Sequence, residues 1–109
     1  MKGTYLGEFE ELVLLVVGTL FDDAYGVAIK QEILSQTKRK VTLSTIHASL
    51  HRLEQKGYVK SRLGDPTQAR GGKRKRLFTL TISGVKALQD AREIRNNLWE
   101  SIPKIAFNI

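Results

Sequence analysis

Residues 42–57 read Thr-Leu-Ser-Thr-Ile-His-Ala-Ser-Leu-His-Arg-Leu-Glu-Gln-Lys-Gly, and the expected fold is organised around them. Ile46, Leu50 and Leu53 recur at i, i+4 and i+7, which predicts one apolar stripe of a helix. Thr42 can cap the start of this helix and Gly57 can end it. The other side is small, polar and basic, with Ser44, His47, Ala48, His51, Arg52 and Gln55. Such a face suits a nucleic-acid groove better than a protein core.

Two helices are expected before this stretch. The first covers residues 6–20, where apolar residues recur with helical spacing and Leu14 and Leu15 widen the stripe, so we expect its middle to be buried on most sides. Its first turn holds acids that favour the helix dipole: Glu8, Glu10 and Glu11.

A turn at residues 22–26 separates the first helix from a shorter one that runs to about Gln36. The polar, basic segment 37–41 then leads into the helix of residues 42–57. Two helices joined by a short turn, the second with a polar outer face, form the helix-turn-helix pattern.

The periodicity changes after Gly57. Residues 58–63 alternate like a strand, and residues 76–81 are rich in aromatic and β-branched side chains. Between them, proline and paired glycines predict a loop. Its basic residues are Arg70, Lys73, Arg74 and Lys75. A hairpin with a basic loop directly after such a helix is the layout of a winged helix-turn-helix.

A last helix is expected from residue 83, capped by Thr81 or by Ser83, and Pro103 should end or kink it. A near-heptad seam runs along it through Ala87, Ala91, Ile94, Leu98, Ile102 and Ile105, with Trp99 beside it. We expect the seam to pair with the same helix of a second subunit. The alternative is that this helix folds back on the first one.

The chain has 109 residues, and its net charge of +7 is concentrated in the centre. Residues 52–76 carry nine basic side chains against Glu54 and Asp65, and Lys38, Arg39 and Lys40 precede them without an acid between. Residues 1–37 are net acidic. A basic sector on an acidic remainder is typical of a surface that binds a polyanion; the alternative is a solvated basic face without a partner.

Other chemistries find little support in the sequence. Without cysteine there is no disulfide framework or thiolate site. His47 and His51 are spaced like zinc ligands, but Ala48 stands where a zinc peptidase has glutamate, and we expect no metal and no cofactor. Gly71-Gly72-Lys73 lacks P-loop spacing. We therefore expect no enzyme and no catalytic residue. With neither a membrane span nor an export leader, a cytoplasmic location is expected.

Four segments together resemble the PadR family of bacterial transcriptional regulators, in particular its short members. They are residues 6–15, 24–26, 50–59 and 76–84, so the resemblance spans about Leu6 to Leu88. It implies a winged helix domain, a C-terminal helix that builds a homodimer, and repression by operator binding. His47 departs from the family, which usually has tyrosine there, and Leu77-Phe78 replaces two aromatic residues.

In short family members a tryptophan of the dimer helix can line a pore for flat aromatic ligands, so the resemblance makes Trp99 a candidate for such a site; otherwise Trp99 packs at the dimer seam. We expect a mainly α fold with a small β-hairpin: a winged helix-turn-helix over residues 1–82 and a dimerisation helix over 83–109, in one compact unit.

The expected function is transcriptional regulation, as a repressor, by a homodimer that binds double-stranded DNA. The side chains expected at phosphates are Lys38, Arg39, Lys40, Arg70, Lys73, Arg74 and Lys75. Those expected in the groove are Ser44, Thr45, His47, His51 and Arg52. The dimer interface should hold Ala87, Ala91, Ile94, Leu98, Trp99 and Ile102. The alternative is a winged helix that binds protein or RNA without reading DNA sequence.

Overall fold

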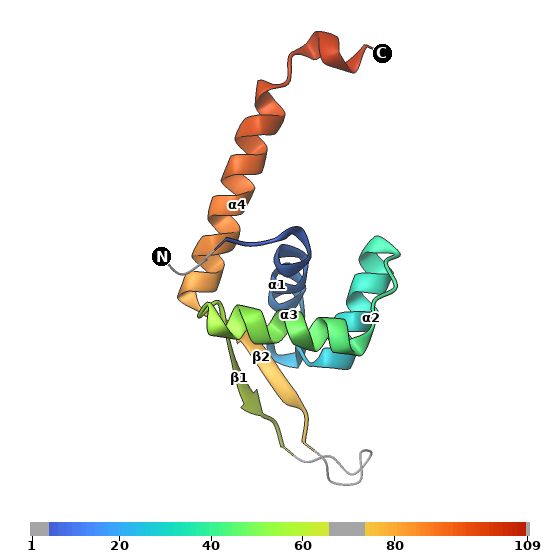
Figure 1. Ribbon diagram of the computed structural model, residues 1–109, viewed down its shortest axis with the longest axis vertical. Coiled ribbons are helices and arrows are strands. Elements are labelled where there is room, and N and C mark those ends of the chain that lie inside the picture. The colour runs from blue at the N-terminus through green and yellow to red at the C-terminus, as the bar shows by residue number, and fades with distance from the viewer. Residues whose placement is uncertain (1–4, 66–73, 109) are drawn as a thin grey trace.

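A computed structural model describes residues 5–65 and 74–108. It confirms the predicted fold class: a mainly helical domain with a small hairpin (Figure 1). In chain order the elements are α1 (Glu8–Leu20), the 3-10 helix η1 (Phe21–Asp23), α2 (Gly26–Thr37), α3 (Leu43–Gln55), β1 (Val59–Leu63), β2 (Arg76–Leu80), α4 (Ile82–Ser101) and the 3-10 helix η3 (Lys104–Phe107). Among the described residues, no helix has both the length and the apolar character that a membrane crossing requires.

The caps that end and start the helices are those that the sequence predicts. The Thr42 hydroxyl accepts a hydrogen bond from the Thr45 N–H at 3.2 Å and so caps α3. Gly57 follows α3 with φ of 80°, a conformation that glycine reaches without steric cost. At the start of α4 the cap is Thr81 rather than Ser83, since the Thr81 hydroxyl accepts from the Gly84 N–H at 3.0 Å.

The core forms where α1, α2 and α3 pack on one another and on the base of the hairpin. The predicted stripe of α3 faces it: Ile46, Leu50 and Leu53 are at most 1% exposed. On α1 the expectation holds for Leu14, which is fully buried, but is wrong for Leu15, which is 48% exposed. Leu15 lies on the side of α1 that faces α4, where it lines an open groove instead of the core.

The hairpin is antiparallel, with Val59 opposite Leu80 and Leu63 opposite Arg76. Its base is tied to the helices, because the Phe78 N–H donates to the Ala24 carbonyl at 2.9 Å and Phe78 is buried. The strands therefore leave the core in a fixed direction, and Figure 1 shows them extending from the helical body as a wing.

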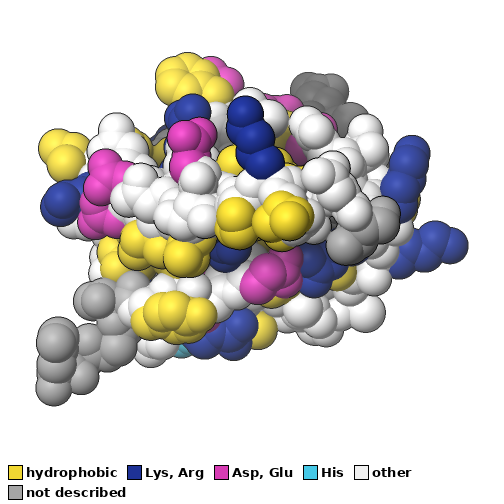
Figure 2. Space-filling model, turned by 90° about the horizontal axis from the view of Figure 1, so that it is seen from above, with side chains coloured by type: hydrophobic (Ala, Val, Ile, Leu, Met, Phe, Trp, Pro, Cys, Tyr) yellow, Lys and Arg dark blue, Asp and Glu magenta, His cyan; other side chains and the backbone are white. Residues whose placement is uncertain are grey.

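α4 rests on the domain as far as Arg95, which pairs with Glu11 of α1, and its C-terminal end projects away from the domain (Figure 1). Gly84 is buried against the Tyr58 carbonyl, and Ala87 packs against the core. Further along, Ile94, Leu98 and Trp99 are between 61% and 65% exposed. Seen along the long axis from above, hydrophobic side chains lie at the surface in several patches (Figure 2).

The sequence predicts that Pro103 ends or kinks the last helix, and in the structure α4 ends just before it. The residue before it, Ile102, has an extended backbone with ψ of 122°, because a residue that precedes proline is disfavoured from the helical region. The expectation that the seam continues through Ile105 is wrong for this reason, since Ile105 lies in η3. The turn brings Phe107 back onto Trp99, with ring centroids 5.5 Å apart.

Candidate nucleic-acid interface

The outer face of α3 is a solvent-exposed stripe formed by Ser44, Ala48, His51 and Gln55. These residues recur at i, i+4, i+7 and i+11, so they project from one side of the helix while the apolar stripe holds the other side in the core. The stripe contains no acid. The exposed acid of α3, Glu54, lies beside the hairpin, where it accepts from the Ser61 hydroxyl at 3.0 Å.

The turn before α3 carries three cations that were expected at DNA phosphates. In the part of the chain that the structure describes, two of them are unpaired and one is paired with an acid of α1. Lys38 and Lys40 are exposed and make no ion pair among the described residues, 5–65 and 74–108. Lys38 closes α2 in the left-handed conformation, with φ of 63°. Arg39 is instead held on α1: its guanidinium lies 2.8 Å from a Glu8 carboxylate oxygen and 5.2 Å from the centre of the Phe9 ring.

At the other end of α3 a carboxylate holds two more cations. Glu10 of α1 is 9% exposed, and its two oxygens lie 2.8 Å from Arg52 Nε and 2.6 Å from Lys56 Nζ. Burial raises the pKa of the Glu10 carboxyl, but the hydrogen bonds and positive charges of Lys56 and Arg52 outweigh burial and hold that pKa below 4.5. Glu10 is therefore an ionised bridge between α1 and α3.

The Glu10 bridge is absent from the sequence expectations, which assigned the three acids of α1 to the helix dipole. The structure gives each acid a basic partner instead: Arg39 for Glu8, Arg52 and Lys56 for Glu10, and Arg95 for Glu11. A signal for Glu10 does exist in the sequence. Glu10 precedes the buried Val13, Leu14 and Val17 by three, four and seven positions, so it shares their face and requires a partner there.

His47 is exposed to solvent, but one edge of its ring lies against α2. A Cβ built on Gly26 would lie 3.0 Å from both Cε1 and Nε2 of His47. Glycine at the start of α2 therefore gives room for the ring. His51, one turn later, is exposed. Within the described part of the chain no three His, Cys, Asp or Glu side chains come together in a way that could hold a metal ion.

The wing contributes Arg74 and Lys75; the expected Arg70 and Lys73 lie outside the described residues. Arg74 is exposed. Lys75 Nζ lies 4.0 Å from the centre of the Tyr25 ring, a cation–π contact that ties the wing to the start of α2. Tyr25 was not among the expected site residues, because the pairing crosses fifty positions of sequence. The exposed stripe of α3 is thus flanked by cations of the turn and of the wing.

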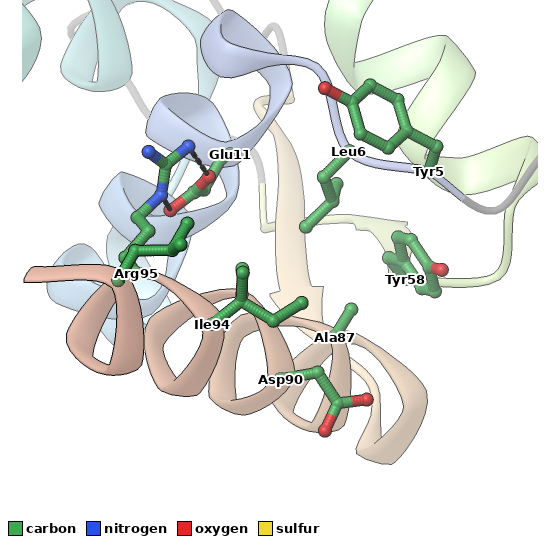
Figure 3. Close-up of a pocket in the computed structure, with 10 residues that line it drawn as sticks. Tyr5, Leu6, Glu11, Tyr58, Ala87, Asp90, Ile94 and Arg95 are labelled. Atoms are coloured by element: carbon green, nitrogen blue, oxygen red, sulfur yellow. Dashed lines mark hydrogen bonds and ion pairs between the residues drawn. The ribbon is translucent and has the colours of Figure 1, made fainter. Parts of the chain in front are cut away.

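A second open region lies between the N-terminal segment and α4 (Figure 3). It is a cavity of about 420 Å³ lined in part by Tyr5, Leu6, Ala87, Ile94 and Leu98, and the Arg95–Glu11 pair, 2.8 Å long, closes one side of it. Four of the expected dimer residues line this cavity: Ala87, Ala91, Ile94 and Leu98. Trp99 is not among its lining residues, so the cavity and the Trp99–Phe107 ring pair are separate features of α4.

Comparisons with known proteins agree with this architecture. The Transcriptional regulator PadR-like family matches residues 13–90. A PadR-like transcription factor from Bacteroides fragilis superposes with a TM-score of 0.73 at 22% identity, covering 86% of this chain and 85% of that one. A PadR family regulator from Clostridium difficile R20291 gives 0.67 at 24% identity, with 94% and 97% covered.

A third solved structure, smu.1704 from Streptococcus mutans UA159, gives a TM-score of 0.68 at 28% identity, covering 89% of this chain and 84% of that one. The comparison with curated proteins finds no match. The family match spans more than half of the chain and includes α2, α3, the hairpin and the start of α4. The chain belongs to the PadR-like family of transcriptional regulators.

Proposed function

We propose that this transcriptional regulator is a repressor that binds a pseudo-palindromic operator as a homodimer. The observation that carries the proposal is the acid-free exposed stripe of α3, with cations before and after it. Cations that neutralise phosphates release counterions and drive binding, whereas only side chains at base edges read sequence.

The proposed contacts divide by chemistry. Lys38, Lys40, Arg74 and Lys75 meet phosphates, together with Arg70 and Lys73 of the loop. Ser44, Thr45, His47 and His51 face the groove, where hydroxyl and imidazole groups can pair with base edges. Arg39 and Arg52 are held by Glu8 and Glu10, so the proposal does not count them among the contacts.

The wing test compares two double variants that each remove two positive charges. Arg74→Ala with Lys75→Ala changes the wing, and Lys86→Ala with Arg92→Ala changes α4. Titrations of a fluorescent duplex over a salt series should show weaker binding and a salt slope lower by about 3.6 for the wing variant, because the homodimer loses four phosphate contacts at about 0.9 each. The α4 variant should bind like the wild type. Equal behaviour of the two variants would contradict the wing assignment.

The homodimer is proposed from the second half of α4. Ile94, Leu98 and Trp99 are more than 60% exposed on a helix that projects from its own domain. The alternative, in which α4 folds back on α1, accounts only for the part of α4 up to Arg95, which pairs with Glu11. Leu98→Glu should convert a dimer into a monomer in sedimentation experiments, while the exposed-side change Glu93→Gln should not. A wild-type protein that sediments as a monomer would refute this part.

An aromatic effector is a second proposal, and it rests on one observation: Trp99 is 63% exposed and forms a tilted ring pair with Phe107. A planar ligand could insert beside these rings. Because Trp99 is the single tryptophan, its fluorescence reports binding directly. Quenching by members of a planar aromatic panel, and release of the duplex by the same compounds, are expected. No quenching across the panel would remove the proposal.

The alternative function, a winged helix that binds protein or RNA, makes a different prediction. Such a module would bind no duplex in preference to bulk DNA. Competition between a selected duplex and a shuffled one therefore separates the two functions.

A further inference from the structure

The bridge from α1 to α3 places one carboxylate between Arg52 of α3 and Lys56, the residue that follows the last turn of α3. Glu10 is 9% exposed, and each of its oxygens pairs with a different cation, Arg52 at 2.8 Å and Lys56 at 2.6 Å. The exposed pair Arg39–Glu8, in which the Glu8 side chain is 67% exposed, is far more open to solvent. Solvent and salt therefore screen the Glu10 bridge less than the Arg39–Glu8 pair, and the Glu10 bridge is the stronger constraint on α3.

Arg52 is oriented toward the protein by both ends of its guanidinium. Nε donates to Glu10, and Nη2 donates to the hydroxyl of Ser49 at 3.3 Å; Ser49 is itself fully buried. The Arg52 side chain is nevertheless 51% exposed, so it stands at the edge of the outer face of α3. Without Glu10, a long and flexible cation at this edge would be free to meet a phosphate.

We infer that Glu10 is a specificity-determining residue: it withholds Arg52 and Lys56 from DNA phosphates, which lowers sequence-independent binding, and it fixes the angle of α3 on α1, on which the reading of bases depends. The inference rests on the proposed DNA binding. Affinity for bulk DNA comes from phosphate neutralisation, whereas discrimination comes from contacts to bases. Two cations fewer at the phosphates weaken binding to every sequence alike. Discrimination depends on the second effect of the bridge, which keeps the base-reading stripe of α3 at a fixed angle on α1.

The test compares Glu10→Gln with Glu93→Gln, which removes the same charge from an exposed position on α4. Each protein is titrated with a duplex selected by the wild type from a random pool, and with a shuffled duplex of equal length, over a salt series. For Glu10→Gln we expect about fivefold tighter binding of the shuffled duplex at low salt and a salt slope steeper by about 1 to 2 for each subunit of the dimer. The ratio of selected to shuffled affinity should fall. Glu93→Gln should match the wild type.

A second variant separates withheld charge from simple loss of structure. Loss of structure would weaken binding to both duplexes, whereas freed cations strengthen binding to the shuffled one. Adding Arg52→Gln to Glu10→Gln should remove about 0.9 of the extra slope for each subunit of the dimer. Glu10→Gln that discriminates as well as the wild type would overturn the inference.

If circular dichroism shows that Glu10→Gln does not fold, the Arg52→Gln variant alone tests the inference. The inference expects the salt slope of Arg52→Gln to equal that of the wild type. A slope lower by about 0.9 for each subunit of the dimer would show that Arg52 already meets a phosphate, and would overturn the inference while the proposed function stands. A wild-type protein that binds no duplex would instead remove the proposed function and this inference with it.

Discussion

Replacing Gly84 with alanine should loosen α4 from the rest of the domain. Gly84 lies in the first turn of α4 and is buried against the segment that joins α3 to β1. A Cβ built on it would lie 2.1 Å from the Tyr58 carbonyl oxygen and 3.0 Å from the carbonyl carbon. These atoms belong to the backbone, so they cannot turn aside as the end of a side chain can.

The magnitude follows from the contacts that must shift. Relieving the clash moves α4 away from Tyr58, which lengthens the hydrogen bond from the Thr81 N–H to the Tyr58 carbonyl, now 3.1 Å. Overpacking of a tight site costs about 1–3 kcal/mol, and a lost hydrogen bond about 1 kcal/mol. Alanine returns about 1 kcal/mol through its helix preference. The expected net loss is about 2 kcal/mol of the free energy of unfolding.

Urea unfolding followed by circular dichroism measures this loss, at one protein concentration because a dimer's stability depends on it. Gly7→Ala is the matched control, since nothing lies within 4 Å of a Cβ built there and the residue has an ordinary φ of −69°. The control places alanine at the N-cap of α1 and should change stability by at most about 1 kcal/mol. A Gly84→Ala protein as stable as this control would refute the packing of α4 on Tyr58 described here.

Three further predictions concern α3 and its supports. Lys56 and Arg52 hold the pKa of Glu10 below its ordinary value, so the stabilising effect of the ionised carboxylate is present at neutral pH and is lost as the pH falls through the folded-state pKa. The difference in unfolding free energy between wild type and Glu10→Gln should be constant near neutral pH and shrink at acidic pH, and a difference that grows on acidification would contradict this. Gly26→Ala should push the His47 ring away from α2, because the added Cβ would lie 3.0 Å from two ring atoms, and should weaken operator binding by about fivefold or more. If Gly26→Ala weakens binding equally in a His47→Ala background, the displaced ring is not the cause of the loss. Thr42→Ala should cost about 1 kcal/mol of stability by removing the cap of α3, while Thr42→Ser should restore it; equal melting curves for the two variants would count against the cap.

Local chemistry explains why most of the fold could be predicted from the sequence. The stripe of Ile46, Leu50 and Leu53 and the caps Thr42 and Thr81 depend on residues within one or two turns, and the structure confirms each of them. The hairpin also agrees to within one residue at each end, because alternation and a glycine-containing loop are local signals.

The supports of the candidate site depend on pairs that are distant in sequence. Glu10 meets Arg52 and Lys56 across more than forty positions, and neither the spacing nor the composition of one segment specifies such a pair. The same holds for Lys75 on Tyr25. Leu15 shows that a hydrophobic pattern does not by itself predict burial. An apolar residue beside the core stripe can line an outer groove instead of packing in the core.

The most direct test of the central claim is selection of duplexes from a random pool by the wild-type protein, followed by titration of the enriched duplex over a salt series. The account predicts an enriched site of two inverted half-sites about 34–36 Å apart, with affinity that falls steeply with salt. A pool that shows no enriched duplex after repeated rounds, although the protein remains folded, would contradict the claim that α3 reads DNA.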